Sequence, residues 1–301
     1  MVQIESFSFL VLIFMAYLLV RMGFDANVFA SIPKLLFTFC YPSLILVSLA
    51  ALESDLSSQH IFFVIAFSVV STFSIYLITQ AALFRYKNEL RREVIALYMV
   101  VGNVTFTGLP FLSYFFGPFG VSFAILFTVV QDFFIWSVGY ARFSGKSNIK
   151  QSIKTILNPC FIAVIIGFII AGSQWTIPGS VKLPVQMLAD ATIPLALICI
   201  GSLLAQNRGT LKAIDRDAIL VVAAKTFLVP AIGAVLLLLI GVDIYLVVLC
   251  AFILCLPAPL IAILFAKEFD KDVSFANVIF VVSTLVFIFI CVVLHQLQTW
   301  A

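Results

Sequence analysis

The sequence predicts an all-α integral membrane protein with ten transmembrane helices, arranged as two five-helix halves of opposite orientation. Composition gives the class, because hydrophobic residues make up 63% of the 301 positions and charged residues only 10%. The mean hydropathy is +1.21. A soluble domain carries roughly 25% charged residues, so this chain has too little polar surface to cover a globule. Block length and charge distribution then give the number and direction of the helices.

Polar breaks divide the chain into apolar blocks, each long enough to cross a hydrocarbon core, for which about 20 residues suffice. The expected spans cover residues 5–22, 30–51, 60–84, 94–116, 119–142, 155–173, 184–205, 216–240, 243–265 and 273–297. The first block lacks a basic flank and a small-residue cleavage site, so we expect it to be a membrane helix and not a removable signal peptide. An even number of spans places both termini on one side.

Basic residues mark the cytoplasmic side of a membrane protein. All but two of the 17 lysines and arginines fall near the loops that follow spans 1, 3, 5, 7 and 9. These are Arg21, Lys34, Arg85, Lys87, Arg91, Arg92, Arg142, Lys146, Lys150, Lys154, Arg208, Lys212, Arg216, Lys267 and Lys271. Lys182 lies on the opposite side, and Lys225 lies inside span 8. We therefore expect a multi-pass protein of the cytoplasmic membrane with both termini outside the cytoplasm.

The basic loop after span 5 divides the chain into a first repeat over residues 1–145, a short cytoplasmic linker over 146–154 and a second repeat over 155–301. Each half has an odd number of spans, so homologous halves would be inverted. A shift of about 150 residues supports a duplication of this kind. It places Pro42 on Pro194, Leu109-Pro110 on Leu256-Pro257, and Gln131-Asp132 on Ser283-Thr284.

Spans 4 and 9 occupy equivalent places in the two halves, and both contain helix-breaking residues at mid-membrane. The candidate binding residues are Asn103, Thr105, Thr107, Gly108 and Pro110 in span 4, and Pro257, Ala258 and Pro259 in span 9. Proline removes an amide donor, and the freed backbone groups cannot face lipid. Two broken helices that cross would direct helix N-termini at one point, which suits an anion such as a carboxylate. The alternative is that these prolines only kink packed helices.

Ionisable residues within the apolar blocks are the next candidates, because a charge in a membrane is costly unless it is paired or hydrated. Asp132, in span 5, could bind a proton or cation or simply form a hydrogen bond inside the bundle. Thr284, its repeat partner, and the neighbouring Ser283 join it as candidate ion-coupling residues. Lys225 could balance an anionic substrate, or its side chain could snorkel to the interface.

The sequence shows no constellation typical of an enzyme. His60 and His295 are the two histidines, far apart in sequence, and there is no HExxH, P-loop or nucleophile elbow. The six cysteines sit inside apolar blocks without metal-ligand spacing. We expect no enzymatic activity, no metal or other cofactor and no nucleic-acid partner.

Five segments in register resemble one family of carriers. They are Asn103 with Gly108-Leu109-Pro110, Asn158-Pro159 with Gly167, Asp190-Ala191 with Pro194-Leu195-Ala196-Leu197 and Gly201, Lys225 with Pro230, and Leu256-Pro257 with Phe265-Ala266-Lys267-Glu268-Phe269. This pattern resembles the auxin efflux carrier family, which includes plant PIN-type auxin carriers and bacterial carriers of malate or malonate type. The resemblance covers most of the chain. The loop after span 5 is much shorter than in the plant members.

The resemblance implies a secondary transporter that moves a small organic anion across the inner membrane by an elevator mechanism. Helices 1, 2, 6 and 7 would form a scaffold that pairs into a homodimer, and helices 3, 4, 5, 8, 9 and 10 would form the transport domain. Asn103, Pro110 and Pro257 match the family's crossover residues. The coupling ion, H⁺ or Na⁺ if any, stays open. The alternatives are a sodium- or proton-coupled carrier of bile-acid or antiporter type, or a channel or membrane sensor.

Overall fold

The computed structural model describes residues 2–25, 28–29, 31–50, 57–145, 159–173 and 177–300. Every regular element in these ranges is a helix, and none of the described residues forms a strand. The expected linker at 146–154 lies outside the described residues. All six cysteines are buried free thiols.

Helices lie within all of the expected spans, and several spans are divided into two or more helices. In the first half they are α1 (Val2–Arg21), α3 (Ile32–Leu35), α4 (Tyr41–Ala50), α6 (Ser58–Ala82), α7 (Glu89–Val100), α8 (Leu109–Phe134) and α9 (Tyr140–Ser144). In the second half they are α11 (Pro159–Gly172), α12 (Gly179–Asp190), α13 (Thr192–Gln206), α14 (Arg216–Ala223), α15 (Val229–Leu239), α16 (Ile244–Leu254), α17 (Leu260–Glu268) and α18 (Val273–Trp300). Single π-helical turns at Leu36–Cys40, Val104–Gly108, Ile135–Gly139 and Ala224–Leu228 join neighbouring helices, and a 3₁₀ segment covers Arg208–Ala213.

Six helical stretches among the described residues are long and apolar enough to cross a membrane. They cover Ile32–Ala50, Ser58–Ala82, Val104–Ser144, Gly179–Gln206, Arg216–Leu239 and Val273–Leu297, with shorter apolar helices at Leu10–Arg21, Pro159–Gly172 and Ile244–Leu254. The longest stretch, Val104–Ser144, is broken at Gly117, where φ is 60° and ψ is −152°, directly before Pro118. This break falls at the expected boundary between spans 4 and 5.

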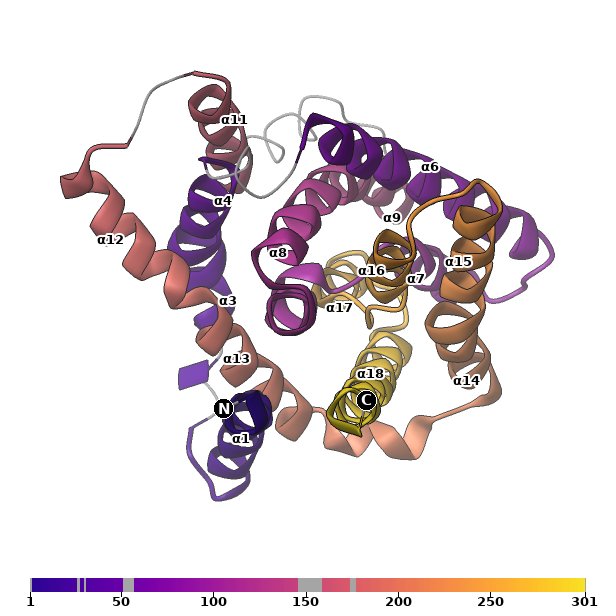
Figure 1. Cartoon of the computed structure of the whole chain (residues 1–301). Coiled ribbons are helices and arrows are strands. Elements are labelled where there is room, and N and C mark those ends of the chain that lie inside the picture. Colours follow the sequence, from indigo (N-terminus) through magenta and orange to yellow (C-terminus); the bar gives the residue numbers. More distant parts are fainter. Residues whose placement is uncertain are drawn as a thin grey trace. The chain divides into compact units, whose positions relative to one another are not determined.

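The chain forms two compact units, each made of segments from both halves of the sequence. Unit 1 comprises Met1–Ala66, Thr105–Phe133 and Ile149–Gln206. Within it, α1 packs along α13, and α4 packs against α11 and α12 (Figure 1). A Cβ atom at Gly201 of α13 would lie 2.1 Å from the Ile13 carbonyl oxygen of α1. Glycine at this position therefore sets the close approach of the two helices, as small residues do between membrane helices.

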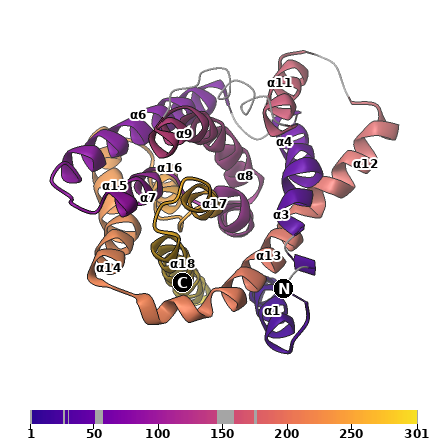
Figure 2. The ribbon, with the colours of Figure 1, turned by 180° about the vertical axis from the view of Figure 1, so that it is seen from behind.

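Unit 2 comprises Phe67–Val104, Phe134–Asn148 and Asn207–Ala301. Here α15 packs against α16, while α18 contacts α14, α17 and the 3₁₀ segment that precedes α14 (Figure 2). The short helix α17 also contacts α7 and α9. Rings from this region pack edge to face around Phe265 of α17, which contacts Trp136, Tyr140 and Phe143.

Candidate functional site

Both expected helix interruptions exist. Helix α7 ends at Val100, and Val101 is already extended, with φ −99° and ψ 132°. Residues 101–103 are non-helical before the π-helical turn begins at Val104. In the second half, α16 ends at Leu254 and α17 begins at Leu260 after Pro259. The prolines and glycines in these segments thus interrupt their helices and do more than kink them.

Within unit 2 the two interrupted segments meet. The Asn103 N–H donates to the Pro257 carbonyl oxygen at 2.9 Å. A Cβ atom at Gly102 would lie 2.8 Å from Leu256 Cβ, so only glycine at this position lets the two interrupted segments approach so closely. On the other side of Pro257, the Ala258 N–H donates to Ser283 Oγ of α18 at 2.9 Å. We call the meeting of residues 102–103 with residues 256–258 the crossover. Helix α18 anchors it through the side chain of Ser283, one of the candidate ion-coupling residues.

Lys225 lies close to this crossover. Its side chain leaves the π-helical turn between α14 and α15 and is 1% exposed. The Nζ atom donates to the Met99 carbonyl oxygen, near the C-terminal end of α7, at 2.9 Å. Because the side chain points into the unit and bonds to the backbone of another helix, Lys225 does not snorkel.

Buried hydroxyl groups surround the same region of unit 2. The Tyr98 hydroxyl lies beside the hydroxyls of Thr226 and Ser283. Among the described residues, Tyr98 Oη and Thr284 Oγ1 form no hydrogen bond of normal geometry, although both are buried. Buried polar atoms generally have partners, so these hydroxyls have capacity left for a water molecule or a polar ligand.

The remaining crossover candidates are buried as well. Thr107 is 0% and Thr105 8% exposed, and Gly108 and Pro110 are buried with them. These four residues follow Asn103 along the chain, in the π-helical turn and the first turn of α8. They belong to unit 1, whereas Asn103, Lys225, Pro257, Ala258 and Pro259 belong to unit 2. The hydrogen bonds above join only members of the second set.

Asp132 has its own surroundings in unit 1. It is half-buried on α8, and the Tyr41 hydroxyl and the Cys160 thiol lie within its electrostatic reach. Thr105 and Thr128 lie beside the Tyr41 hydroxyl. The other two candidate ion-coupling residues, Ser283 and Thr284, lie in unit 2. No group of three or more His, Cys, Asp or Glu side chains in the described part of the chain could hold a metal ion.

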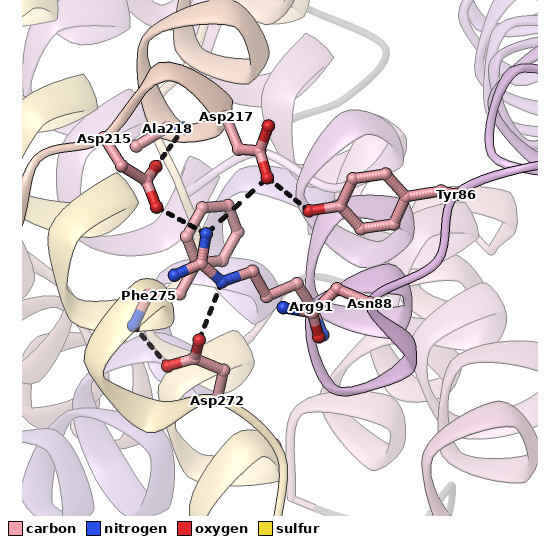
Figure 3. Close-up of polar contacts among 8 residues, drawn as sticks. All are labelled: Tyr86, Asn88, Arg91, Asp215, Asp217, Ala218, Asp272 and Phe275. Carbon is pink, nitrogen blue, oxygen red and sulfur yellow. Dashed lines mark hydrogen bonds and ion pairs between the residues drawn. The ribbon is translucent and has the colours of Figure 1, made fainter.

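A charged cluster that the sequence did not single out lies elsewhere in unit 2, centred on Arg91 of α7 (Figure 3). Its guanidinium group forms ion pairs with Asp215 at 2.5 Å and Asp272 at 2.8 Å, and lies 3.6 Å from Asp217. Asp217 also accepts a hydrogen bond from the Tyr86 hydroxyl at 2.6 Å. One arginine thus joins three aspartates from two other loops.

Two of these aspartates also cap helices. Asp215 accepts from the Ala218 N–H at 2.9 Å at the start of α14, and Asp272 accepts from the Phe275 N–H at 2.8 Å at the start of α18. Arg91 also lies over the Phe275 ring, 4.5 Å from its centroid. The cluster therefore ties together the N-termini of α7, α14 and α18, where carboxylates are favoured by the helix dipole.

These contacts change the acidities of the groups outside the membrane spans. Burial and the Asp217 carboxylate raise the pKa of Tyr86 to about 12. Burial opposes ionisation of Asp215, but the Ala218 N–H and the Arg91 guanidinium outweigh it and hold the pKa of Asp215 below its ordinary value. Burial likewise disfavours the Arg91 cation, yet the hydrogen bonds that Arg91 donates to Asp272 and Asp215 raise the pKa of Arg91. At neutral pH Arg91 and Asp215 are therefore both charged, and Tyr86 keeps its proton.

Comparison with protein families decides the chain's membership. A sequence model described as "Membrane transport protein" matches residues 2–148 and 146–295. The two matches together cover nearly the whole chain, and they divide where the sequence divides into halves. The chain belongs to this family. It is the membrane transport family of auxin efflux carrier type, as the five segments around Asn103, Gly167, Gly201, Lys225 and Pro257 suggested.

Membership in the membrane transport family makes the chain a multi-pass membrane transporter, which agrees with its apolar helices. The two consecutive matches also fit an inverted repeat. The comparison with curated proteins finds no match.

Sequence reasoning missed two groups in this transporter. Tyr98 and Thr226 were not candidates, because isolated hydroxyl residues in an apolar block carry no signal until the fold brings them together. The Arg91 cluster was missed because its members lie in loops expected to be solvated. Its signal was nevertheless present, since Asp215 and Asp272 each directly precede a predicted helix.

Proposed function

We propose that this protein is a secondary transporter that moves a small organic anion, a carboxylate, across the cytoplasmic membrane by an elevator-type alternating-access mechanism. The observation that carries the proposal is the meeting of two interrupted helices through the Asn103–Pro257 hydrogen bond, in a chain of the membrane transport family. Transporters built from inverted repeats place their substrate sites at such discontinuous helices near the midplane.

The substrate site proposed here consists of the crossover residues. In unit 2, the Asn103 side chain and the backbone of the interrupted segment at Pro257, Ala258 and Pro259 would contact a carboxylate. In unit 1, the candidates are the hydroxyls of Thr105 and Thr107 and the Gly108 backbone just before the break at Pro110. Lys225 supplies positive charge to the same region. Asp132, Ser283 and Thr284 are the candidates for ion coupling, with H⁺ or Na⁺ as the coupling ion if one is used.

The two compact units match the expected scaffold and transport domains only in part, because α7 belongs to unit 2, α8 belongs to unit 1 up to Phe133, and α6 is divided between the units. The expected scaffold helices 1, 2, 6 and 7 correspond to α1, α3–α4, α11 and α12–α13, which all belong to unit 1. The expected helices 8, 9 and 10 correspond to α14–α18 and all belong to unit 2. We propose that each chain has ten transmembrane helices arranged as a 5+5 inverted repeat. We also propose that the scaffold helices of two chains pair to form a homodimer.

Ion pairs between loops bear on the orientation of the chain in the membrane. Arg91, Asp215 and Asp272 come from the loops that precede spans 4, 8 and 10, and the ion pairs of unit 2 bring these three loops together. Arg142, after span 5, likewise pairs with Glu93 at 2.8 Å. These contacts support a common face for the basic loops. We propose that this face is cytoplasmic and that both termini lie outside.

Flux measurements on proteoliposomes test the proposal. Labelled malate, malonate and an indole acid are offered in turn, and we expect saturable uptake of at least one of them. The Asn103→Ala variant should lose at least about 90% of this flux at unchanged membrane insertion, because it removes a polar ligand and little apolar volume. Gln296→Ala, on the exposed end of α18, is the control and should transport normally. Non-saturating ion current, or full flux through Asn103→Ala, would contradict the proposed site.

A further inference from the structure

At the end of α7, the Asn103 N–H and the Met99 carbonyl oxygen form hydrogen bonds with partners outside the helix and not with each other. In a continuous α-helix the Asn103 N–H would donate to the Met99 carbonyl oxygen, four residues earlier. Here the Asn103 N–H donates to Pro257 instead, at 2.9 Å. The Met99 carbonyl oxygen accepts from Lys225 Nζ, also at 2.9 Å. The lysine therefore takes the acceptor that the helix interruption releases.

The position of the ammonium group is one where a cation is favoured. The last carbonyl groups of a helix carry a partial negative charge, and Met99 lies in the last turn of α7. In transporters with discontinuous helices, the C-terminal ends of half-helices coordinate the coupling cation. Lys225 Nζ sits at such an end, but it is covalently attached and cannot dissociate.

Among the described residues, no carboxylate pairs with the Lys225 side chain. Lys225 is 1% exposed, and none of the ion pairs among the described residues includes it. Its neighbours are the Met99 carbonyl group and the Cys255 thiol, with the hydroxyl of Thr226 on the next residue. A buried cation that lacks an acidic partner is costly, so the site gains from an anion that comes close.

We propose that Lys225 is a fixed cation of this transporter. Its ammonium group supplies, at the end of α7, the positive charge that a bound metal ion would supply in an ion-coupled carrier. The inference rests on the proposed transport function and refines one part of it. Lys225 acts on the substrate through its charge and through the crossover backbone that it holds, as a positioning residue. Binding of the anion therefore needs no bound Na⁺.

The first test uses the thermal unfolding of purified protein, which does not depend on knowing the substrate. The unfolding temperature of the wild type should be the same in NaCl, KCl and choline chloride at equal ionic strength. Lys225→Ala leaves an uncovered carbonyl group and a cavity, so it should unfold at a lower temperature. Ethylammonium chloride should then raise its unfolding temperature by about 3 °C or more over choline chloride, because a ligand that binds only the folded state stabilises it.

Two further variants separate charge from volume. Lys225→Met fills the cavity without a charge and should show no response to ethylammonium. Lys225→Arg keeps a charge and should resemble the wild type in its indifference to cations. Stabilisation of the wild type by Na⁺ over choline would overturn the proposal, even if Lys225→Ala failed to fold. An equal response of Lys225→Ala and Lys225→Met to ethylammonium would also overturn it.

Flux then distinguishes this inference from the proposed function. Wild-type uptake should be unchanged, within about twofold, when choline replaces Na⁺ on both sides. Saturable flux that requires Na⁺ would reject the fixed cation and leave the transport function intact. Indifference of unfolding to cations, together with an absence of flux, would keep the fixed cation and reject the choice of substrate.

Discussion

At the scale of single residues, the crossover depends on small groups that the chain could not replace. Gly102 lies where a Cβ atom would meet Leu256 Cβ at 2.8 Å, and the next residue donates the bond to Pro257. The Leu256 atom in question is the one nearest the backbone, so it cannot rotate away. A change that separates Gly102 from Leu256 should therefore also break the hydrogen bond from the Asn103 N–H to the Pro257 carbonyl oxygen.

Gly102→Ala should accordingly weaken the crossover. Overpacking of this kind costs about 2 kcal/mol, which corresponds to a fall of about 5 °C in the unfolding temperature, measured in detergent by intrinsic fluorescence. The matched control is Gly209→Ala in the same unit, where an added Cβ has nothing within 4 Å. If both variants unfold at the wild-type temperature, the two interrupted segments are not in close contact.

Some of these residues could be predicted and others could not. Asn103, Pro257 and Lys225 were found because a polar residue, a proline or a charge stands out against an apolar block. The Met99 carbonyl oxygen could not be identified as the partner of Lys225. Every residue has such a carbonyl group, and only the fold decides which one is released by a helix interruption and reached from another helix.

At the scale of helices, the interruptions were predicted and the π-helical turns were not. Proline and glycine mark where a helix must break. The turns at Leu36–Cys40 and Ala224–Leu228 consist of residues that an α-helix would accept. Such bulges arise when tertiary contacts shift the backbone register, and they are frequent at functional sites. The turn at Ala224–Leu228 carries Lys225, so it directs that side chain inward.

The Arg91 cluster links the starts of α7, α14 and α18, and its geometry predicts how variants behave. Arg91→Ala removes the ion pairs with Asp215, Asp217 and Asp272 and leaves three aspartates, two of them helix caps, with uncompensated negative charge. Exposed pairs are worth up to about 1 kcal/mol each, so we expect the unfolding temperature to fall by about 5 °C. Arg91→Lys keeps the charge but loses the planar fork, and should recover about half of this loss. Equal unfolding temperatures for the wild type and Arg91→Ala would show that the cluster adds nothing to stability.

The same cluster predicts a dependence on pH. The pKa of Asp215 is lower in the folded protein than its ordinary value of 3.8. Its contribution to stability is therefore present above the pKa of the unfolded chain and is lost as the pH falls through the folded value. Below about pH 4 the wild type should lose stability more steeply than Asp215→Asn, which cannot take up this proton. Parallel curves of unfolding temperature against pH would contradict the assignment.

At the scale of the whole molecule, the halves of the sequence and the units of the structure are different divisions. The family match divides near residue 147, whereas each compact unit takes segments from both halves. The repeat could be predicted from prolines that recur at one shift. The units could not, because hydrophobic blocks that all suit a membrane give no signal for which block packs against which.

The orientation of the whole chain is the part of this picture that charge alone predicts, and labelling in intact cells can test it. A cysteine at an exposed position outside the membrane reacts with a membrane-impermeant maleimide, whereas a cytoplasmic one does not until the membrane is opened. The six native thiols are buried, so the background should be low. Lys182→Cys should be labelled in intact cells and Lys212→Cys only after permeabilisation, because the basic loop that holds Lys212 is retained in the cytoplasm. The reverse pattern would invert the topology and place both termini inside.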